Sequence, residues 1–233
     1  MDFVYPLMPT NFEKLIGTDL KEEMVSYCND CYAKCERVKF EVLDIGTDEV
    51  PAHLCGQFDH VTSFYCLQWV QNQRKMLKNI WNLLRFEGGD CLFAFLGTQF
   101  LYDIYEKMSE LPKWSSYLED YKKFVSPYHE SPDAAAEFQQ LLEDAGFVDI
   151  TVEAWNGTYA YYSLRVIRNL YRAICPFFDR IPETLHEEFL DDFINTMVKL
   201  NLRQHRDDSD EYDWISTYKL VVAYARKPVT KTK

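Results

Sequence analysis

Short apolar runs and amphipathic segments alternate along most of the chain. The apolar runs are rich in β-branched and aromatic residues and are bounded by polar or glycine-containing turns, a pattern that predicts strands. The strands are expected at 14–20, 38–45, 58–66, 90–96, 147–155 and 217–225. Strands that alternate with helices are typical of an α/β sandwich with a mostly parallel sheet. No internal repeat or linker interrupts the pattern, so we expect a single domain over residues 1–233.

The segments between the strands carry apolar residues at helical spacing. Helices are expected at 21–35, at 69–84, from 131 to 145 and over most of 163–204. For the third of these, Ser131 is the predicted N-cap, with Pro132 at the first helical position, and Gly146 is predicted to end the helix. Two segments, about 98–130 and 156–213, are expected as helical insertions that form a lid over the carboxyl edge of the sheet. Residues beyond the last strand read as a loose basic tail that begins at Lys227.

The stretch 58–70 combines a predicted buried strand with side chains that can bind a ligand. It begins as a strand and ends in a polar-aromatic turn that contains Gln68 and Trp69. In open α/β sheets, ligands bind outside the carboxyl ends of the strands. A glutamine amide and an indole N–H are hydrogen-bond donors, and neither has an evident structural role here. We therefore expect the functional end of the molecule at this turn.

Two earlier strands also end in polar groups, at Asp19 and Asp44. In nucleotide-binding sheets, a carboxylate after the second strand accepts hydrogen bonds from the ribose hydroxyls. An acid after the third strand can accept from an adenine amino group. Each aspartate also suits a helix N-cap. The pair, followed by the 58–70 stretch, favours an adenosyl ligand, although no GxGxxG loop can be made from the eight glycines.

Composition and charge remove several classes of function. The net charge of −12 argues against nucleic acid and against an anionic membrane surface, because both bind clustered Lys and Arg. No apolar run approaches the ~20 residues needed to span a bilayer. Aromatic residues make up 16% of the chain. A large aromatic core is the favoured explanation, and a roomy apolar pocket is the alternative.

Seven cysteines are an odd number, and they fall within helical and strand patterns. Reduced thiols in the cytosol are the simplest account, and residues 1–6 lack the features of a signal peptide, so a cytoplasmic location is expected. Cys28, Cys31 and Cys35 share one helix face with Met24. A zinc site needs two converging ligand pairs and none is evident, so core packing of this face is favoured and no metal is predicted.

Several segments together resemble the class I S-adenosylmethionine-dependent methyltransferases. The chain is most similar, within that class, to the insect juvenile hormone acid O-methyltransferases. The segments that carry the resemblance are 17–25 (GTDLKEEMV), 43–46 (LDIG), 63–73 (SFYCLQWVQNQ), 112–114, 126–129, 189–192 and 216–226. The third is the most specific, and the resemblance covers essentially the whole chain. It implies a Rossmann-like methyltransferase sandwich with helical lid insertions.

The resemblance also implies a site. The positions implied for S-adenosylmethionine are Asp19 and Leu20 at the ribose, Asp44 and Ile45 at the adenine, and Ser63 and Phe64 along the cofactor. Gln68 and Trp69 would face the substrate carboxylate. The implied reaction forms the methyl ester of a small apolar acid of the juvenile hormone acid or farnesoic acid type. No metal, nucleic acid or membrane is expected as a partner.

The chain departs from the family in three places. The family has an N-terminal helix, a first strand and a glycine-rich loop ahead of the point that corresponds to Met1, so we expect the first strand to be missing. Gln68 stands where the family usually has His, and the turn at 86–87 lacks the usual Pro. Unpaired backbone groups beside a missing strand would each cost ~1–3 kcal/mol if buried. The alternative is therefore a catalytically inactive methyltransferase-like protein that binds a lipid or a partner.

Overall fold

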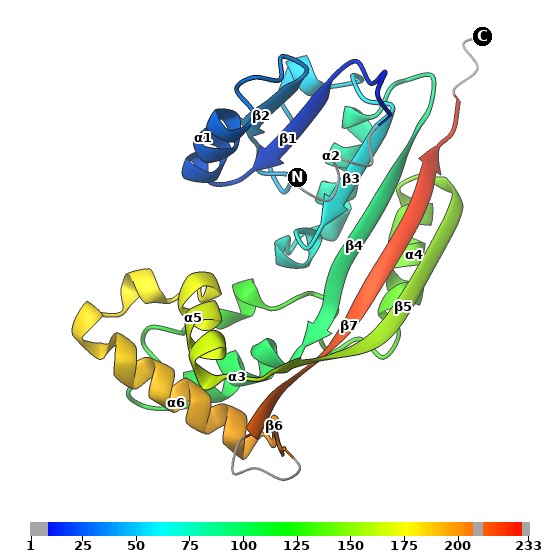
Figure 1. The fold of residues 1–233 in the computed structure, drawn as a ribbon. Helices are drawn as coiled ribbons and strands as arrows, with labels where there is room; N and C mark the ends of the chain where they lie inside the picture. The colour runs from blue at the N-terminus through cyan, green and yellow to red at the C-terminus, as the bar shows by residue number, and fades with distance from the viewer. Residues whose placement is uncertain (1–8, 207–211, 230–233) are drawn as a thin grey trace.

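The computed structural model describes residues 9–206 and 212–229, and their strands form two sheets (Figure 1). The smaller sheet pairs β1 (Leu15–Asp19) in parallel with β2 (Val38–Val42). The larger sheet has the order β3-β4-β7-β5, and β6 pairs with β7. Its strands are β3 (His60–Phe64), β4 (Gly89–Gln99), β5 (Val148–Tyr161), β6 (Arg203–His205) and β7 (Tyr212–Lys227). All six predicted strands are therefore present, and the α/β prediction is confirmed.

The larger sheet is mixed, whereas the sequence pattern predicts a mostly parallel one. Strands β3 and β4 are parallel, but β7 runs antiparallel to both β4 and β5. The reason lies in the second insertion. The chain leaves the sheet at the end of β5 and returns at the start of β7 on the same side, and two neighbouring strands joined at one end must be antiparallel. Strands β4 and β5 also extend into the segments predicted as insertions, to Gln99 and Tyr161.

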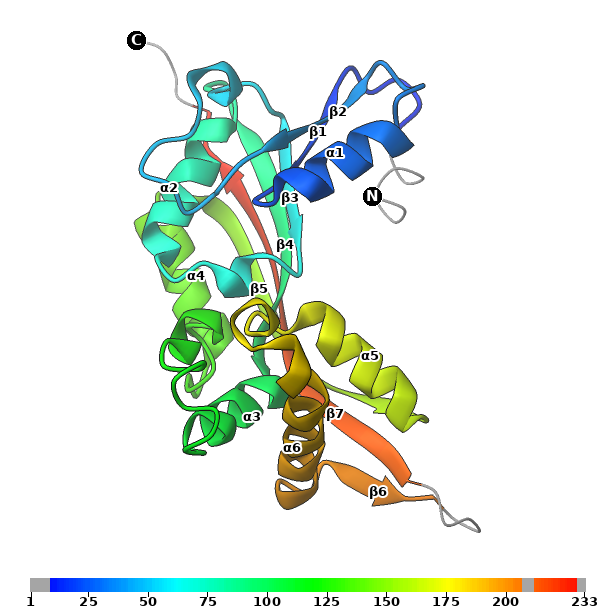
Figure 2. The same cartoon turned by 90° about the vertical axis from the view of Figure 1, so that its left-hand side faces the viewer.

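Six α-helices are described, and they divide between the sheets and a helical layer. They are α1 (Glu22–Cys31), α2 (Gln73–Leu83), α3 (Phe100–Ser109), α4 (Ala134–Asp144), α5 (Leu164–Ile174) and α6 (His186–Lys199). Helices α2 and α4 cover one face of the larger sheet (Figure 2). Leu77 and Phe138 from these helices pack there with Phe93 and Val221 of the strands. None of the described helices is long and apolar enough to cross a membrane.

Both predicted insertions contribute to a single helical layer beyond the carboxyl end of β4. Helices α3, α5 and α6 lie together there (Figure 1), and their buried faces share one apolar cluster. Trp114 from the first insertion is fully buried and donates its indole N–H to Asp192 of α6 at 2.7 Å. The ring of Trp114 also meets Phe189 edge-on. The two insertions are thus fastened to each other as well as to the sheet.

Strands β1 and β3 belong to separate sheets, so no backbone hydrogen bonds of a shared sheet connect them. The smaller sheet instead contacts the rest of the chain through an apolar cluster. Ile16 of β1 and Val61 of β3 both pack against a cluster whose buried members include Leu54 and Leu83. Among the described residues, no strand pairs with the outer edge of β1 or β3.

Helix α1 differs from the predicted packing. Its buried residue is Val25, while Met24 and Cys31 are exposed, so the prediction that the cysteine face packs in the core is wrong for these two. Helix α1 covers a sheet of only two strands, which is too narrow to bury a wide helix face.

Two local predictions, one at the start of a helix and one after the last strand, need correction. Asp133, and not Ser131, is the N-cap of α4, because its carboxylate accepts from the Ala136 N–H at 3.0 Å. Lys227 is not part of a loose tail: it ends β7, is buried, and donates to the carbonyls of Trp81 and Leu84 at the end of α2. Burial lowers the pKa of this ammonium. The predicted stop at Gly146 is confirmed by its φ of 93°.

Candidate functional site

The ends of three strands converge on the thiol of Cys66. Asp19 ends β1, Asp44 follows β2 by two residues, and Ser63 lies in β3. Burial raises the pKa of the Cys66 thiol, the charges of Asp19 and Asp44 raise it further, and a hydrogen bond with Ser63 lowers it. Charges influence a pKa strongly only over short distances. The structure therefore brings three of the predicted cofactor residues around one point.

Each aspartate accepts from its own loop with one oxygen, and no residue in the described part of the chain donates to the other oxygen. Asp19 Oδ1 accepts from the Lys21 N–H, and Asp44 Oδ1 accepts from the Gly46 N–H, both at 2.8 Å. Asp19 is not the N-cap of α1, because that position belongs to Lys21. Both aspartates are exposed. A carboxylate has about four lone-pair positions, so each side chain can still accept from a hydroxyl or amino group of a ligand, as the sugar and base of an adenosyl group require.

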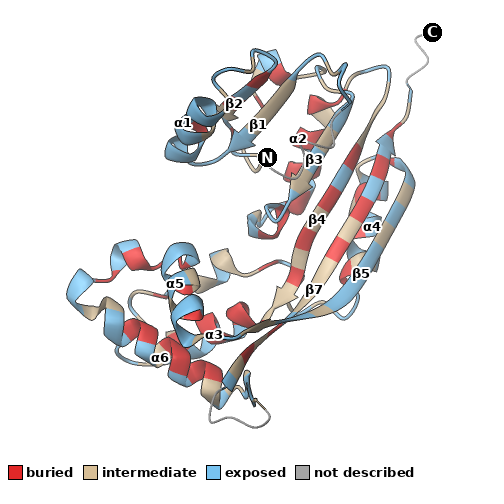
Figure 3. Cartoon of the chain, viewed as in Figure 1, coloured by how far each residue is buried: buried red, intermediate tan, exposed pale blue. Residues whose placement is uncertain are grey.

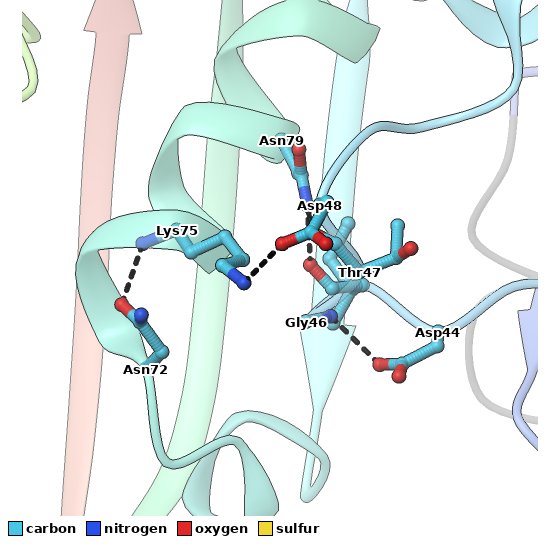
Figure 4. A network of polar contacts seen from close by, with 8 residues as sticks. Asp44, Gly46, Thr47, Asp48, Asn72, Lys75 and Asn79 are labelled. Atoms are coloured by element: carbon cyan, nitrogen blue, oxygen red, sulfur yellow. Dashed lines mark hydrogen bonds and ion pairs between the residues drawn. The ribbon is translucent and has the colours of Figure 1, made fainter.

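The loop that carries Asp44 is fixed by polar residues of α2 (Figure 4). Asn79 donates its amide to the Ile45 and Thr47 carbonyls at 2.9 and 2.7 Å. Lys75 pairs with Asp48 in the same loop. A fixed loop presents Asp44 in one orientation, which favours ligand binding because little order has to be gained on association. Sequence reasoning missed this support. An asparagine one turn after a lysine, close to the apolar face of an amphipathic helix, was the available signal.

Apolar surface lies next to both acids. Leu20 directly follows Asp19 and is 66% exposed, and Phe64 directly follows Ser63 and is 45% exposed. Ile45 directly follows Asp44 and is half-buried. Exposed apolar side chains beside carboxylates suit a ligand with both flat apolar and hydroxyl-bearing parts. The six positions thus combine hydrogen-bonding groups with apolar side chains, and this combination fits an adenosyl group.

Gln68 and Trp69 follow β3 in a short 3₁₀ turn, Leu67–Trp69, and they differ in exposure. Trp69 is 40% exposed, and none of the described residues accepts from its indole N–H. Gln68 is only 2% exposed and donates its amide to the carbonyl of Tyr65, which has a left-handed φ of 55°. Its Oε1 is buried without a partner in the described part of the chain. The contact of Gln68 with a substrate carboxylate therefore stays a prediction.

A second group of residues, not foreseen from the sequence, supports Trp69 from behind. Its indole meets Tyr102 edge-on, and Tyr102 meets the His129 ring in the same way, at centroid distances of 6.2 and 5.2 Å. His129 contacts Thr98 through Nδ1 and Asp103 through Nε2. These residues come from β4, α3 and the loop before α4, so no sequence spacing could have joined them. They set the position of the tryptophan ring at the edge of the site.

We expect His129 to make the stability of this region depend on pH. Its hydrogen bond with Asp103 raises the pKa of the imidazole above 6.5. The protonated form is thus favoured by folding. This stabilisation is complete below about pH 6.5 and is lost as pH rises through the folded pKa. Because Asp103 is 52% exposed, the effect should not exceed about 1 kcal/mol.

Urea denaturation at about pH 5.5 and about pH 8.5 measures this dependence. His129→Gln should remove part of the difference in unfolding free energy between the two pH values, while His205→Gln, at an exposed position of β6, should leave it unchanged. An identical pH dependence in wild type and His129→Gln would contradict the assignment.

Comparison with known sequences gives consistent matches. A family described as a methyltransferase domain matches residues 3–93. The juvenile hormone acid O-methyltransferase of Drosophila melanogaster is 49% identical over 227 residues, which cover 97% of this chain and 76% of that protein. The enzyme of the same name from Bombyx mori is 39% identical over 228 residues, which cover 97% of this chain and 80% of that protein.

Solved structures share the fold at low sequence identity. A candidate methyltransferase of Bacillus halodurans aligns with a TM-score of 0.55 at 16% identity, over 92% of this chain and 83% of that one. The YcgJ protein of Bacillus subtilis aligns with a TM-score of 0.54 at 17% identity, over 93% of this chain and 83% of that one. At these identities the likeness concerns the fold alone.

The described strands, in two sheets with an acid at or just after the ends of β1 and β2 and a polar-aromatic turn after β3, have the fold of a class I methyltransferase. This class uses S-adenosylmethionine as methyl donor. The sequence matches are closer than the class alone requires, since they extend over nearly the entire chain. The chain belongs to the juvenile hormone acid O-methyltransferase family.

Proposed function

We propose that the protein transfers a methyl group from S-adenosylmethionine to the carboxylate of a small apolar acid, of the kind named by its Drosophila and Bombyx relatives. The observation that carries this proposal is that Asp19 and Asp44 lie at or just after the carboxyl ends of the paired strands β1 and β2, where they supply acceptors for an adenosyl group. The proposed reaction needs no metal ion and no nucleic-acid or membrane partner.

The chemistry asks for alignment more than for proton transfer. A carboxylic acid with a pKa near 4 is already ionised at about pH 7, so no general base is needed. The cofactor, when bound, supplies a methyl group on a sulfonium that is displaced in line by the carboxylate. Holding the two reactants in that line can supply ~7–11 kcal/mol in favourable intramolecular cases. In this proposal Asp19 and Asp44 orient the adenosyl group, while Trp69 and Gln68 donate to the carboxylate.

Two measurements test the proposal. Calorimetric titration with S-adenosylmethionine should show micromolar binding, and incubation with a sesquiterpenoid or fatty acid should give its methyl ester by mass spectrometry. An inactive methyltransferase-like protein would bind the acid without forming ester. The comparisons do not favour that alternative, and ester formation would exclude it.

Gln68→His should tighten the binding of the acid. Both side chains can donate a hydrogen bond to the carboxylate, but a protonated histidine also adds a positive charge, and such an ion pair is worth up to about 1 kcal/mol. We therefore expect the KM for the acid to fall roughly fivefold. Steady-state kinetics at saturating cofactor measures it, with Gln57→His, at an exposed position, as the matched control. An unchanged KM would exclude position 68 from carboxylate binding.

A further inference from the structure

A buried glutamine of α2 binds the backbone of the turn that follows β3. Gln73 is the first residue of α2 and is 6% exposed. Its side-chain amide donates to the carbonyls of Leu67 and Val70, at 2.9 and 2.6 Å. These carbonyls flank Gln68 and Trp69, the two residues proposed to meet the substrate carboxylate. One side chain therefore holds the turn on both sides of its functional residues.

The orientation of this amide is fixed by Tyr128, from the loop before α4. The Tyr128 hydroxyl donates to Gln73 Oε1 at 3.0 Å. The amide oxygen must point to the phenol and the amide nitrogen to the turn, because the turn offers carbonyls and these can only accept. Tyr128 is 3% exposed, so water does not compete for its hydroxyl. The amide thus has one orientation, with both of its ends hydrogen-bonded inside the protein.

Tyr128 is itself held in place by the core of the larger sheet. In this core, residues of β4 and β7 are buried in alternation (Figure 3), and Tyr128 belongs to the same apolar cluster. Its ring contacts those of Phe95 in β4 and Phe138 in α4, at centroid distances of 5.4 and 6.0 Å. The sheet and α4 therefore set the position of the phenol, and the Gln73 amide links that position to the turn.

The turn depends on support from outside itself. Tyr65 has a left-handed φ of 55°, which is unfavourable for a residue with a Cβ and persists only where the surroundings hold it. Trp69 is 40% exposed, and its one ring contact among the described residues is with Tyr102 at 6.2 Å. The direction of the indole is consequently set largely by the backbone of the turn.

We propose that Gln73, oriented by Tyr128, is a positioning residue for methyl transfer, because it holds the turn so that the Trp69 indole N–H is directed at the substrate carboxylate. Neither Gln73 nor Tyr128 touches the reactants, and both act through the backbone of the turn. The reaction chiefly requires alignment, and a misplacement of about 1 Å can cost about 100-fold in rate. This inference rests on the proposed function and adds two residues to it.

A double-mutant cycle on the full chain tests the proposal. Gln73→Met keeps the length of the side chain but removes its donors and its acceptor, Tyr128→Phe removes only the hydroxyl, and a third variant combines the two. Gln57→Met is the matched control, since this exposed amide also donates to a backbone carbonyl. For each variant, kcat and KM for a sesquiterpenoid or fatty acid are measured per binding site, counted by calorimetric titration with S-adenosylhomocysteine. Urea denaturation gives the stability.

Gln73→Met should lower kcat by roughly 10- to 100-fold and Tyr128→Phe by roughly three- to tenfold, while the affinity for S-adenosylhomocysteine is unchanged. Because Tyr128 acts through Gln73, the combined variant should be no slower than Gln73→Met. It should also be more stable than Gln73→Met, in which the Tyr128 hydroxyl is buried without a partner. The control should behave as wild type. An unchanged kcat in Gln73→Met, losses that multiply in the combined variant, or a kcat that recovers together with stability would overturn the proposal.

Alkylation of Cys66, which lies in the same turn, separates failure of this inference from failure of the proposed function. Burial raises the pKa of the Cys66 thiol, so a loosened turn should expose the thiol and speed its reaction with iodoacetamide several-fold, read by peptide mass spectrometry. If wild type forms no ester, the proposed function fails. Faster alkylation in Gln73→Met than in wild type would then still support the hold of Gln73 on the turn, and equal rates would refute it.

Discussion

Asp19→Asn should weaken binding of S-adenosylmethionine by about 10- to 100-fold and leave the fold intact. The structure makes this substitution selective, because an asparagine oxygen can still accept from the Lys21 N–H that Asp19 now binds. The substitution therefore removes the charge and one acceptor but keeps the loop. Hydrogen bonds to charged groups are worth ~1.5–3 kcal/mol, and 1.4 kcal/mol is a factor of ten in affinity. Calorimetric titration measures the change.

The control for this prediction is Asp30→Asn, which removes an exposed charge of α1 away from the strand ends. A second measurement tests the geometry without any cofactor. The Asp19 charge contributes to the raised pKa of the Cys66 thiol, so Asp19→Asn should lower that pKa and speed alkylation of Cys66 at a given pH. Wild-type affinity together with wild-type alkylation would place Asp19 outside the site.

Trp114→Ala should destabilise the protein by ~3–5 kcal/mol, the range for removing a buried tryptophan or phenylalanine. The indole is fully buried, meets Phe189 edge-on and donates to Asp192. It therefore links the two insertions through both a polar and an apolar contact. A loss of this size is a large part of a typical folding free energy of ~5–15 kcal/mol. Urea denaturation, read as the unfolding free energy at a fixed temperature, measures it.

Two variants serve as comparisons for Trp114→Ala. Trp114→Phe keeps an aromatic ring but loses the hydrogen bond to Asp192, so it should cost less. Trp155→Ala removes a tryptophan that is 54% exposed on β5, and it should cost about 1 kcal/mol or less. Similar effects of Trp114→Ala and Trp155→Ala would show that the insertions are held together without the Trp114 contacts.

Features of the fold that depend on neighbouring residues were predictable from the sequence, and features that depend on contacts between distant segments were not. The strands at 14–20, 38–45 and 58–66 were located from runs of β-forming residues, and each contains the observed strand. The acids at the ends of the first two, Asp19 and Asp44, were also recognised, because an acid at the end of a strand is a local pattern. The direction of β7 and the role of Lys227 depend on segments far apart in sequence, and no local pattern reports them.

The candidate site likewise has residues that local patterns predicted and contacts that only the folded chain shows. Asp19, Asp44 and Ser63 were proposed one by one from their positions after or within strands, and the structure adds that they meet at Cys66. The support of Trp69 by Tyr102 and His129 was not predictable, because it requires α3 and the loop before α4 to fold back onto the turn after β3. Gln68 was predicted as a substrate donor, and its burial beneath Tyr65 could be learned only from the folded chain.

The sequence by itself determined the class of fold, the strands and the residue types at the strand ends, since these follow from short-range patterns of hydrophobicity and charge. The tertiary structure alone decided the mixed direction of the larger sheet, the joining of both insertions through Trp114, and the hydrogen bonds of Lys227 to the end of α2. Each of these depends on which distant surfaces come into contact. Contact between distant segments is set by the packing of the whole chain, because burial and hydrogen bonding are satisfied jointly by all of its elements.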